Sequence, residues 1–203
     1  MLTYPVMLNI KHKHALVVGG GRIGYRRIIG LLKAGAHVTV VSPVLHPKVE
    51  KLVADNHIVW QEKTFTPRDL ALAWIVVAAT NDPVVNEFIA SSAHDTQLVN
   101  IVDQPEGSQF HVPATVTRGG LAISVSTGGA SPTLANMICE ELRTKYDSSY
   151  ESYIKFLALS RQKIKQLDLA EQKKAQLLRE VTREEYRISS DKQMEFLKRL
   201  TSS

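Results

Sequence analysis

The sequence predicts an α/β protein with a doubly wound parallel sheet, followed by a small β-hairpin region and a C-terminal helical domain. Short runs rich in Val, Ile and Ala alternate with amphipathic segments through residues 14–103, which is typical of parallel strands covered by helices on both faces. A glycine-rich turn joins the first strand to the first helix, as in Rossmann-type folds. After residue 110 the pattern changes to two extended segments and then to charge-rich helices.

The first part of the chain is expected to hold five strands with helical segments between them. The strands are predicted at residues 14–20, 37–43, 57–63, 73–80 and 97–103, and the helical segments at 22–36, 46–55, 68–72 and 82–95. Strands that alternate with helices in this way favour βαβ units in one parallel sheet.

The second part is expected to begin with an antiparallel hairpin, in which residues 110–117 and 121–127 flank a tight Arg-Gly-Gly turn. Ser131 is the predicted N-cap of the next helix, with Pro132 at its first position. Apolar residues at helical spacing then predict helices at 150–167, 169–182 and 191–200. These changes of pattern divide the chain into residues 1–110, a hairpin-plus-helix region at 111–147 and a helical domain at 148–203.

The composition narrows the possible functions. The chain has 203 residues, of which 44% are hydrophobic, and a formal net charge of +5 with most of the excess in residues 111–203. No known nucleic-acid-binding motif accompanies that charge, so no nucleic-acid partner is expected. The single cysteine, Cys139, excludes an intrachain disulfide, and no metal site is predicted. No segment is long and apolar enough to span a membrane, so a cytoplasmic protein is expected.

The turn after the first strand has the G-x-G-x-x-G spacing of a dinucleotide-binding loop. Gly19 permits the tight turn, Gly21 lets a pyrophosphate approach the main chain, and Gly24 lets the helix pack closely on the sheet. The second strand ends in Ser42 and Pro43 instead of the acidic residue that binds the ribose in many NAD enzymes. Ser42 or main-chain groups would then hold the ribose. These residues leave the choice between NAD and NADP open.

Two polar residues follow the fourth strand, at the edge where such sheets bind ligands. Thr80 and Asn81 are interpreted as cofactor contacts, whereas Asp82 suits a helix cap before Pro83.

Asp103 follows the last parallel strand at the same edge, and it could act as a general base or orient a substrate. Its alternative role is formation of the turn in Gln-Pro-Glu-Gly. His111, interpreted as an alternating strand position, could relay a proton or could simply be half-buried. Ser126 and Thr127, before a glycine-rich loop and a helix N-terminus, could bind substrate carboxylates, and they could also simply form the capped start of the helix.

Five stretches in this order resemble the precorrin-2 dehydrogenase family, the dehydrogenase and sometimes ferrochelatase module of siroheme synthases. They are YPVMLNI, ALVVGGGRIGYRR, VVAATNDPVVN, VNIVDQPEGSQFHVPA and VSTGGASPTLA. The resemblance implies that precorrin-2 is oxidised to sirohydrochlorin with NAD⁺, and that Asp103 is the general base. It also implies that Arg22, Ile23, Pro43 and Val44 border the adenosine half of NAD.

The resemblance further implies a homodimer formed through the hairpin at 110–127, with the C-terminal helices beside the substrate. Because the substrate carries many carboxylates, Arg118 and Arg143 are candidate substrate-binding residues. Two alternatives stay open. The same site could also insert Fe²⁺ into sirohydrochlorin, or the chain could be a non-catalytic module that senses NAD(H).

Overall fold

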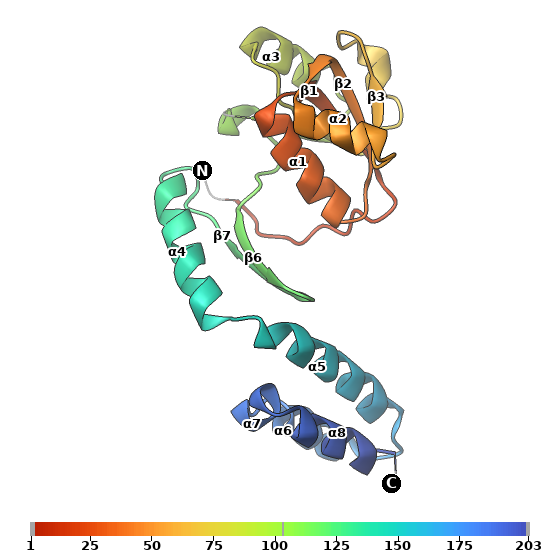
Figure 1. The fold of residues 1–203 in the computed structure, drawn as a ribbon, viewed down its shortest axis with the longest axis vertical. Coiled ribbons are helices and arrows are strands. Elements are labelled where there is room, and N and C mark those ends of the chain that lie inside the picture. The colour runs from red at the N-terminus through yellow and green to blue at the C-terminus, as the bar shows by residue number, and fades with distance from the viewer. Residues whose placement is uncertain (1–2, 103, 202–203) are drawn as a thin grey trace. The chain divides into compact units, whose positions relative to one another are not determined.

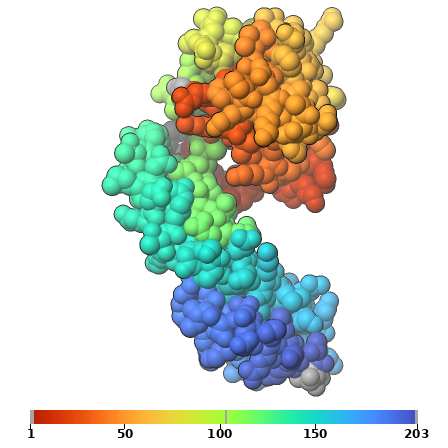
Figure 2. All heavy atoms as spheres, viewed as in Figure 1, coloured from red at the N-terminus to blue at the C-terminus, as the bar shows by residue number. Residues whose placement is uncertain are grey.

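The computed structural model describes residues 3–102 and 104–201, and the chain divides into two compact units between Val112 and Pro113. The first unit is coloured red to green in Figures 1 and 2, and the second green to blue. The division lies close to the predicted change of pattern at residue 110. Whether residues 111–147 and 148–203 are separate domains stays a prediction.

A five-stranded parallel sheet, in the order β3-β2-β1-β4-β5, forms the centre of the first unit. Its strands are β1 (His14–Gly20), β2 (His37–Leu45), β3 (Val59–Gln61), β4 (Ile75–Ala78) and β5 (Leu98–Ile101). Each lies where the sequence predicts a strand, but β2 runs past Pro43. The register between β1 and β2 shifts between Val18 and Gly20, so Pro43 faces an irregular part of the ladder, where a missing N–H is tolerated.

Helices cover both faces of this sheet (Figure 1). The helical segments are α1 (Arg22–Lys33), α2 (Pro47–Ala54), the short 3₁₀ segment η1 (Pro67–Leu70), α3 (Pro83–Ser92) and the 3₁₀ turn η2 (Pro105–Gly107). One apolar cluster joins Ile28 of α1 and Val49 of α2 to one face of the sheet, and a second joins Ile89 of α3 to the other face. The predicted doubly wound, Rossmann-type fold class is therefore confirmed.

The outer edge of β5 is covered by residues 108–110. The N–H of Gln109 donates to the carbonyl oxygen of Val99 at 2.9 Å, and its side-chain Oε1 accepts the N–H of Val99 at 2.7 Å. Asn100 Nδ2 donates to the carbonyl oxygen of Phe110 at 3.0 Å. Gln109 thus pairs with Val99 as a residue of a neighbouring strand would, and Phe110 adds a further bond to this edge.

The second unit begins with the predicted hairpin and helix, which are β6 (Ala114–Arg118), β7 (Leu121–Val125) and α4 (Pro132–Lys145). One face of the hairpin packs against α4 and buries Val116. The other face is exposed in this chain; its residues are Thr115, Thr117, Ala122 and Ser124. The hydroxyl of Ser131 accepts the N–H of Leu134 at 3.1 Å, so the predicted N-cap of α4 is confirmed.

Four helices complete the second unit, namely α5 (Ser149–Gln166), α6 (Glu171–Glu180), α7 (Glu184–Ile188) and α8 (Ser190–Arg199). The sequence predicts three of them; α7 is five residues long, too short to show a helical period. Their core is aromatic: Phe156 contacts the rings of Tyr186 and Phe196 at centroid distances of 5.8 and 6.0 Å. The Tyr153 hydroxyl donates to the carbonyl oxygen of Val181 at 2.9 Å, which satisfies its buried polar end.

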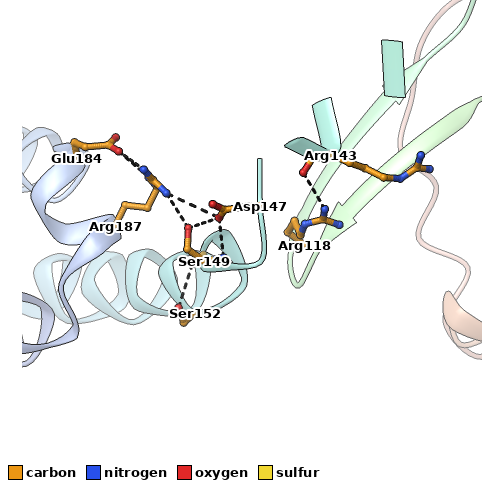
Figure 3. Close-up of polar contacts among 7 residues, drawn as sticks. All are labelled: Arg118, Arg143, Asp147, Ser149, Ser152, Glu184 and Arg187. Atoms are coloured by element: carbon orange, nitrogen blue, oxygen red, sulfur yellow. Dashed lines mark hydrogen bonds and ion pairs between the residues drawn. The ribbon is translucent and has the colours of Figure 1, made fainter. Parts of the chain in front are cut away.

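Arg187 of α7 joins this helix to the start of α5 (Figure 3). Its guanidinium donates to the hydroxyl of Ser149 at 2.8 Å, forms an ion pair with Glu184, and lies 5.3 Å from the ring centroid of Tyr150. It also approaches Asp147 to 3.9 Å. Hydrogen bonds from Ser149, and then the Arg187 charge, lower the pKa of Asp147.

Candidate active site

The carboxyl ends of β1 and β4 lie where the order of the strands reverses, which is the place where doubly wound sheets bind ligands. The turn after β1 packs tightly there. Gly19 has φ +112°, and a Cβ at this position would lie 2.3 Å from the carbonyl oxygen of Ala79, just after β4. Glycine is therefore required, and its absence of a side chain brings the predicted dinucleotide-binding loop against the end of β4.

The other two glycines of the loop differ in their surroundings. A Cβ on Gly24 would lie 2.2 Å from the carbonyl oxygen of Gly19, whereas a Cβ on Gly21 would meet no atom of the described residues within 4 Å. Gly21 is the N-cap of α1, provides no side-chain cap, and is followed by Arg22 and Ile23 without an acidic residue in the first turn. The N–H groups and positive dipole end of α1 can therefore hold an anion. These residues fit a dinucleotide pyrophosphate.

The end of β2 lies directly on this loop. A Cβ on Gly20 would come within 2.5 Å of the Leu45 side chain and 2.7 Å of the Val44 carbonyl oxygen. Ser42 is buried and its hydroxyl donates to the carbonyl oxygen of Val44 at 2.7 Å, so towards a ribose it can act only as an acceptor. Pro43 and Val44 are exposed. Gly20 was not among the residues predicted from the sequence, although a third consecutive glycine is more than the loop spacing needs.

Thr80 is part of a polar network after β4. Its hydroxyl donates to Asn86 Oδ1 at 2.7 Å, while its N–H donates to the same oxygen at 3.1 Å. Asn86, which is 5% exposed, returns a bond from Nδ2 to the Thr80 carbonyl at 3.2 Å. Asp82 caps α3 by accepting the N–H of Val84 at 2.9 Å, as predicted, and Asn81 is exposed. Asn86 was not predicted from the sequence. A polar residue at a helical position expected to be buried could have indicated such a role.

Asp103, the predicted general base, lies outside the described residues. The chain on either side of it is held by Ser108, whose hydroxyl accepts the N–H of Ile101 at 2.9 Å. The same hydroxyl lies 3.1 Å from the carbonyl oxygen of Gln104, to which it can donate. Ser108 thus links the end of β5 to the first residue after position 103.

In the second unit, the predicted substrate residues lie in the loop before α4. Ser126 Oγ accepts the N–H of Gly128 at 3.2 Å, and Thr127 Oγ1 accepts the N–H of Ser131 at 3.0 Å. Gly128 and Gly129 adopt positive φ angles of 63° and 88°, which shape this turn. Because both hydroxyls accept these bonds, each keeps a hydrogen that can be donated to a carboxylate.

Arg118 has a hydrogen-bonding role within the second unit (Figure 3). It donates to the carbonyl oxygen of Arg143, in the last turn of α4, at 3.2 Å and to that of Thr117 at 3.0 Å. Its Nε is buried without a hydrogen-bond partner among the described residues. Arg143 forms an ion pair with Glu140. A substrate role for either arginine stays a prediction.

The expected position of His111 on a strand is wrong. The strand begins only at Ala114, and His111 is exposed in the irregular segment before it. The proline at position 113 has no N–H to donate, which explains why the ladder starts one residue later. A proton-relay role for His111 stays a prediction.

Neither a metal site nor a membrane span emerges from the described parts of the chain. Residues 3–102 and 104–201 contain no group of three or more His, Cys, Asp or Glu side chains placed to hold a metal ion. Among the same residues, no helix has the length and apolar character needed to cross a bilayer.

The sheet and its glycine loop define a dinucleotide-binding protein of the Rossmann class. Residues 6–114 match the family described as "Putative NAD(P)-binding", residues 118–144 match "Sirohaem biosynthesis protein central", and residues 150–196 match "SirC C-terminal domain". The chain is 39% identical to the precorrin-2 dehydrogenase of Priestia megaterium over 97% of this chain and 98% of that protein. It belongs to the precorrin-2 dehydrogenase family.

Other relatives agree with this assignment. The precorrin-2 dehydrogenase of Bacillus subtilis (strain 168) is 33% identical over 78% of this chain and 98% of that protein. A siroheme synthase of Methylobacillus flagellatus is 40% identical over 82% of this chain but only 36% of its own length. The solved structure described as "SirC, precorrin-2 dehydrogenase" matches 99% of this chain and 100% of that chain, with a TM-score of 0.85 and 38% identity.

Proposed function

We propose that this chain oxidises precorrin-2 to sirohydrochlorin with NAD⁺ in siroheme biosynthesis. The observation that carries the proposal is the likeness to precorrin-2 dehydrogenases over nearly the whole of both chains. It includes the second unit as well as the dinucleotide-binding unit, whereas a general dinucleotide-binding module would account only for the first. A non-catalytic NAD(H) sensor is therefore not favoured.

The glycine loop is proposed to hold the cofactor. NAD⁺ held there would supply the hydride acceptor for the reaction. Gly21 leaves room for the pyrophosphate at the N-terminus of α1, and Gly19 and Gly24 fix the loop by close packing. Thr80 and Asn81 stand just beyond β4, on the side of the reversal point where the nicotinamide half would extend. They are proposed as contacts of that half, Thr80 through a hydroxyl already ordered by Asn86.

The reaction removes a hydride and a proton from the macrocycle and leaves one more double bond. Asp103 is proposed to accept the proton, because a carboxylate is a suitable general base and follows the last strand at the cofactor edge. Ser108 supports this role by binding Ile101 and Gln104 on either side of that position.

The carboxylates of precorrin-2 are proposed to bind the second unit. The free hydroxyl hydrogens of Ser126 and Thr127, together with the N-terminus of α4, provide donors for an anion. Arg118 adds positive charge next to the hairpin turn. His111, next to the last residue of the first unit, is the proposed proton relay.

A homodimer formed through the β6–β7 hairpin and a cytoplasmic location are part of the same proposal. The hairpin presents an exposed face with alternate Thr and Ser residues, and a two-stranded sheet gains stability when it packs against a further surface. Cys139 is a buried free thiol, which suits a reducing compartment. Light scattering during size-exclusion chromatography tests the dimer, since a monomeric mass would contradict it.

Anaerobic absorbance spectroscopy of enzyme-generated precorrin-2 tests the reaction. Addition of the protein and NAD⁺ should produce the sirohydrochlorin spectrum, and Asp103→Asn should lower kcat by about a thousandfold, a loss in the range typical of a positioned base. Asp95→Asn, which changes an exposed carboxylate before β5, is the matched control and should keep the wild-type rate. No NAD⁺-dependent spectral change with the wild type would refute the proposed function.

Metal insertion into sirohydrochlorin is a separate activity and is not favoured. The same assay measures it when Fe²⁺ or Co²⁺ is added after oxidation is complete. A loss of the sirohydrochlorin spectrum faster than the protein-free rate would add a chelatase activity to the dehydrogenase.

A further inference from the structure

Basic side chains gather just beyond the end of β2, next to the glycine loop. His46 is the N-cap of α2, and Lys48 is the second residue of that helix. Both contact Tyr25 of α1: the His46 ring stacks on the Tyr25 ring at a centroid distance of 6.3 Å, and Lys48 Nζ lies 5.6 Å from the same centroid. Two basic side chains from the N-terminus of α2 are therefore held on one aromatic ring.

Hydrogen bonds orient His46 within this arrangement. Its N–H donates to the carbonyl oxygen of Gly20 at 2.8 Å, which ties it to the glycine loop. Its side-chain Nδ1 accepts the N–H of Lys48 at 3.2 Å. A ring that accepts this bond carries its proton on Nε2, so this nitrogen is a donor.

The charge around this aromatic ring favours an anion. Arg22 is exposed and lies three residues before Tyr25 on α1, which places the two on the same face of the helix. The end of β2 offers Ser42, a proline and a valine in place of a carboxylate. An acidic residue, Glu50, is exposed in the first turn of α2. The basic residues Arg22, His46 and Lys48 outnumber it.

In dinucleotide-binding folds the end of the second strand determines which cofactor is accepted. A carboxylate there binds the ribose hydroxyls of NAD and repels a 2′-phosphate, while a nearby basic side chain accommodates the phosphate of NADP. We propose that this cofactor site accepts the 2′-phosphate of NADP⁺ as well as NAD⁺, with His46 and Lys48 as the phosphate-binding residues. The inference depends on the dinucleotide site of the proposed function and extends it.

Direct binding of cofactor fragments tests the inference without catalysis. Isothermal titration of the full chain should show that 2′,5′-ADP binds about tenfold more tightly than 5′-AMP, a difference typical of charge-assisted hydrogen bonds to a phosphate. Lys48→Glu should abolish this preference. Lys51→Glu, the same charge change in the last turn of the same helix, is the matched control and should keep it.

Steady-state kinetics provides the second measurement. The wild type should use NADP⁺ with a kcat/KM within about tenfold of that for NAD⁺, and Lys48→Glu should shift the ratio of the two about tenfold towards NAD⁺. Equal affinities for 2′,5′-ADP and 5′-AMP in the wild type, with NADH still bound, would overturn this inference alone. Binding of neither NADH nor NADPH would overturn the proposed function as well.

Discussion

The two units of the chain are stabilised in different ways. The first unit has an aliphatic core, and its loops at the carboxyl edge of the sheet are closed by bonds from uncharged side chains, such as Asn86 and Ser108, to the main chain. The second unit has an aromatic core, and ion pairs such as Lys192–Glu185 and Arg199–Glu180 join its helices.

This difference matches the requirement of the dinucleotide loop in the first unit. A dinucleotide loop needs a fixed main-chain geometry, and close packing of glycine against carbonyl groups provides it without an ion pair. Ion pairs between partly exposed side chains contribute less to the free energy of unfolding than close packing does, and salt weakens them. The second unit should therefore be the more sensitive of the two to ionic strength and to acid, which protonates the carboxylates of these pairs.

The largest effect is expected when the glycine packing of the first unit is broken. Gly19→Ala places a Cβ 2.3 Å from a main-chain oxygen at a positive φ, so it should lower the free energy of unfolding by about 3 kcal/mol. Gly21→Ala meets open space and should cost less than about 1 kcal/mol, yet it should weaken NADH binding. Chemical denaturation and NADH titration of both variants measure this. Equal losses of stability would contradict the packing argument.

The next effect concerns Ser108. Ser108→Ala leaves the N–H of Ile101 without its partner and should lower the free energy of unfolding by about 1.5 kcal/mol. Ser108→Thr retains a hydroxyl and should recover most of this loss. If the hydroxyl also positions the Asp103 segment, kcat should fall in Ser108→Ala while NADH affinity stays at the wild-type value. A variant with unchanged stability and kcat would show that the bond is dispensable.

A smaller, pH-dependent effect is expected in the second unit. Burial would raise the pKa of Glu180, but hydrogen bonds from Arg199 and Tyr186 outweigh it and lower the pKa below its usual value. Burial and the hydrogen bond to Glu180 raise the pKa of Tyr186 to about 12, so the phenol stays a donor.

A carboxylate whose pKa is lower in the folded state stabilises the protein above its unfolded-state pKa. That stabilisation is lost as the pH falls through the folded-state pKa. Melting curves between about pH 6 and pH 3 should therefore show a smaller decline in Tm for Glu180→Gln than for the wild type, because the unfolded-state pKa is about 4.3. Parallel declines would show that Glu180 contributes nothing to the acid sensitivity.

The smallest effect should be a gain in stability. The hydroxyl of Ser160 in α5 is fully buried without a hydrogen-bond partner among the described residues. Its removal in Ser160→Ala should raise the free energy of unfolding by about 1 kcal/mol, because an unsatisfied polar group no longer has to be buried. Ser152→Ala, in the same helix but exposed and bonded to Ser149, is the control and should change little. Destabilisation by Ser160→Ala would reveal a partner for this hydroxyl.

The positions of the strands and the glycine loop were predictable because they rest on local patterns. Apolar runs fix the strands, and the spacing of Gly19, Gly21 and Gly24 directly after one of them fixes the loop. The roles of Gln109 and Lys48 were not predictable, because each depends on a partner in another element of the fold. Gln109 bonds to Val99 across the edge of a strand, and Lys48 reaches the ring of Tyr25 on another helix.

The cover over β5 also bears on how the protein behaves in a crowded solution. An open strand edge presents unpaired N–H and carbonyl groups that can recruit a strand of another molecule and start aggregation. Gln109 occupies such groups of Val99 on one side of the sheet, and the opposite edge is formed by β3, which is only three residues long. Both edges of the parallel sheet are thereby protected. The two-stranded β6–β7 sheet, in contrast, keeps open edges to which a strand of a second protomer could add.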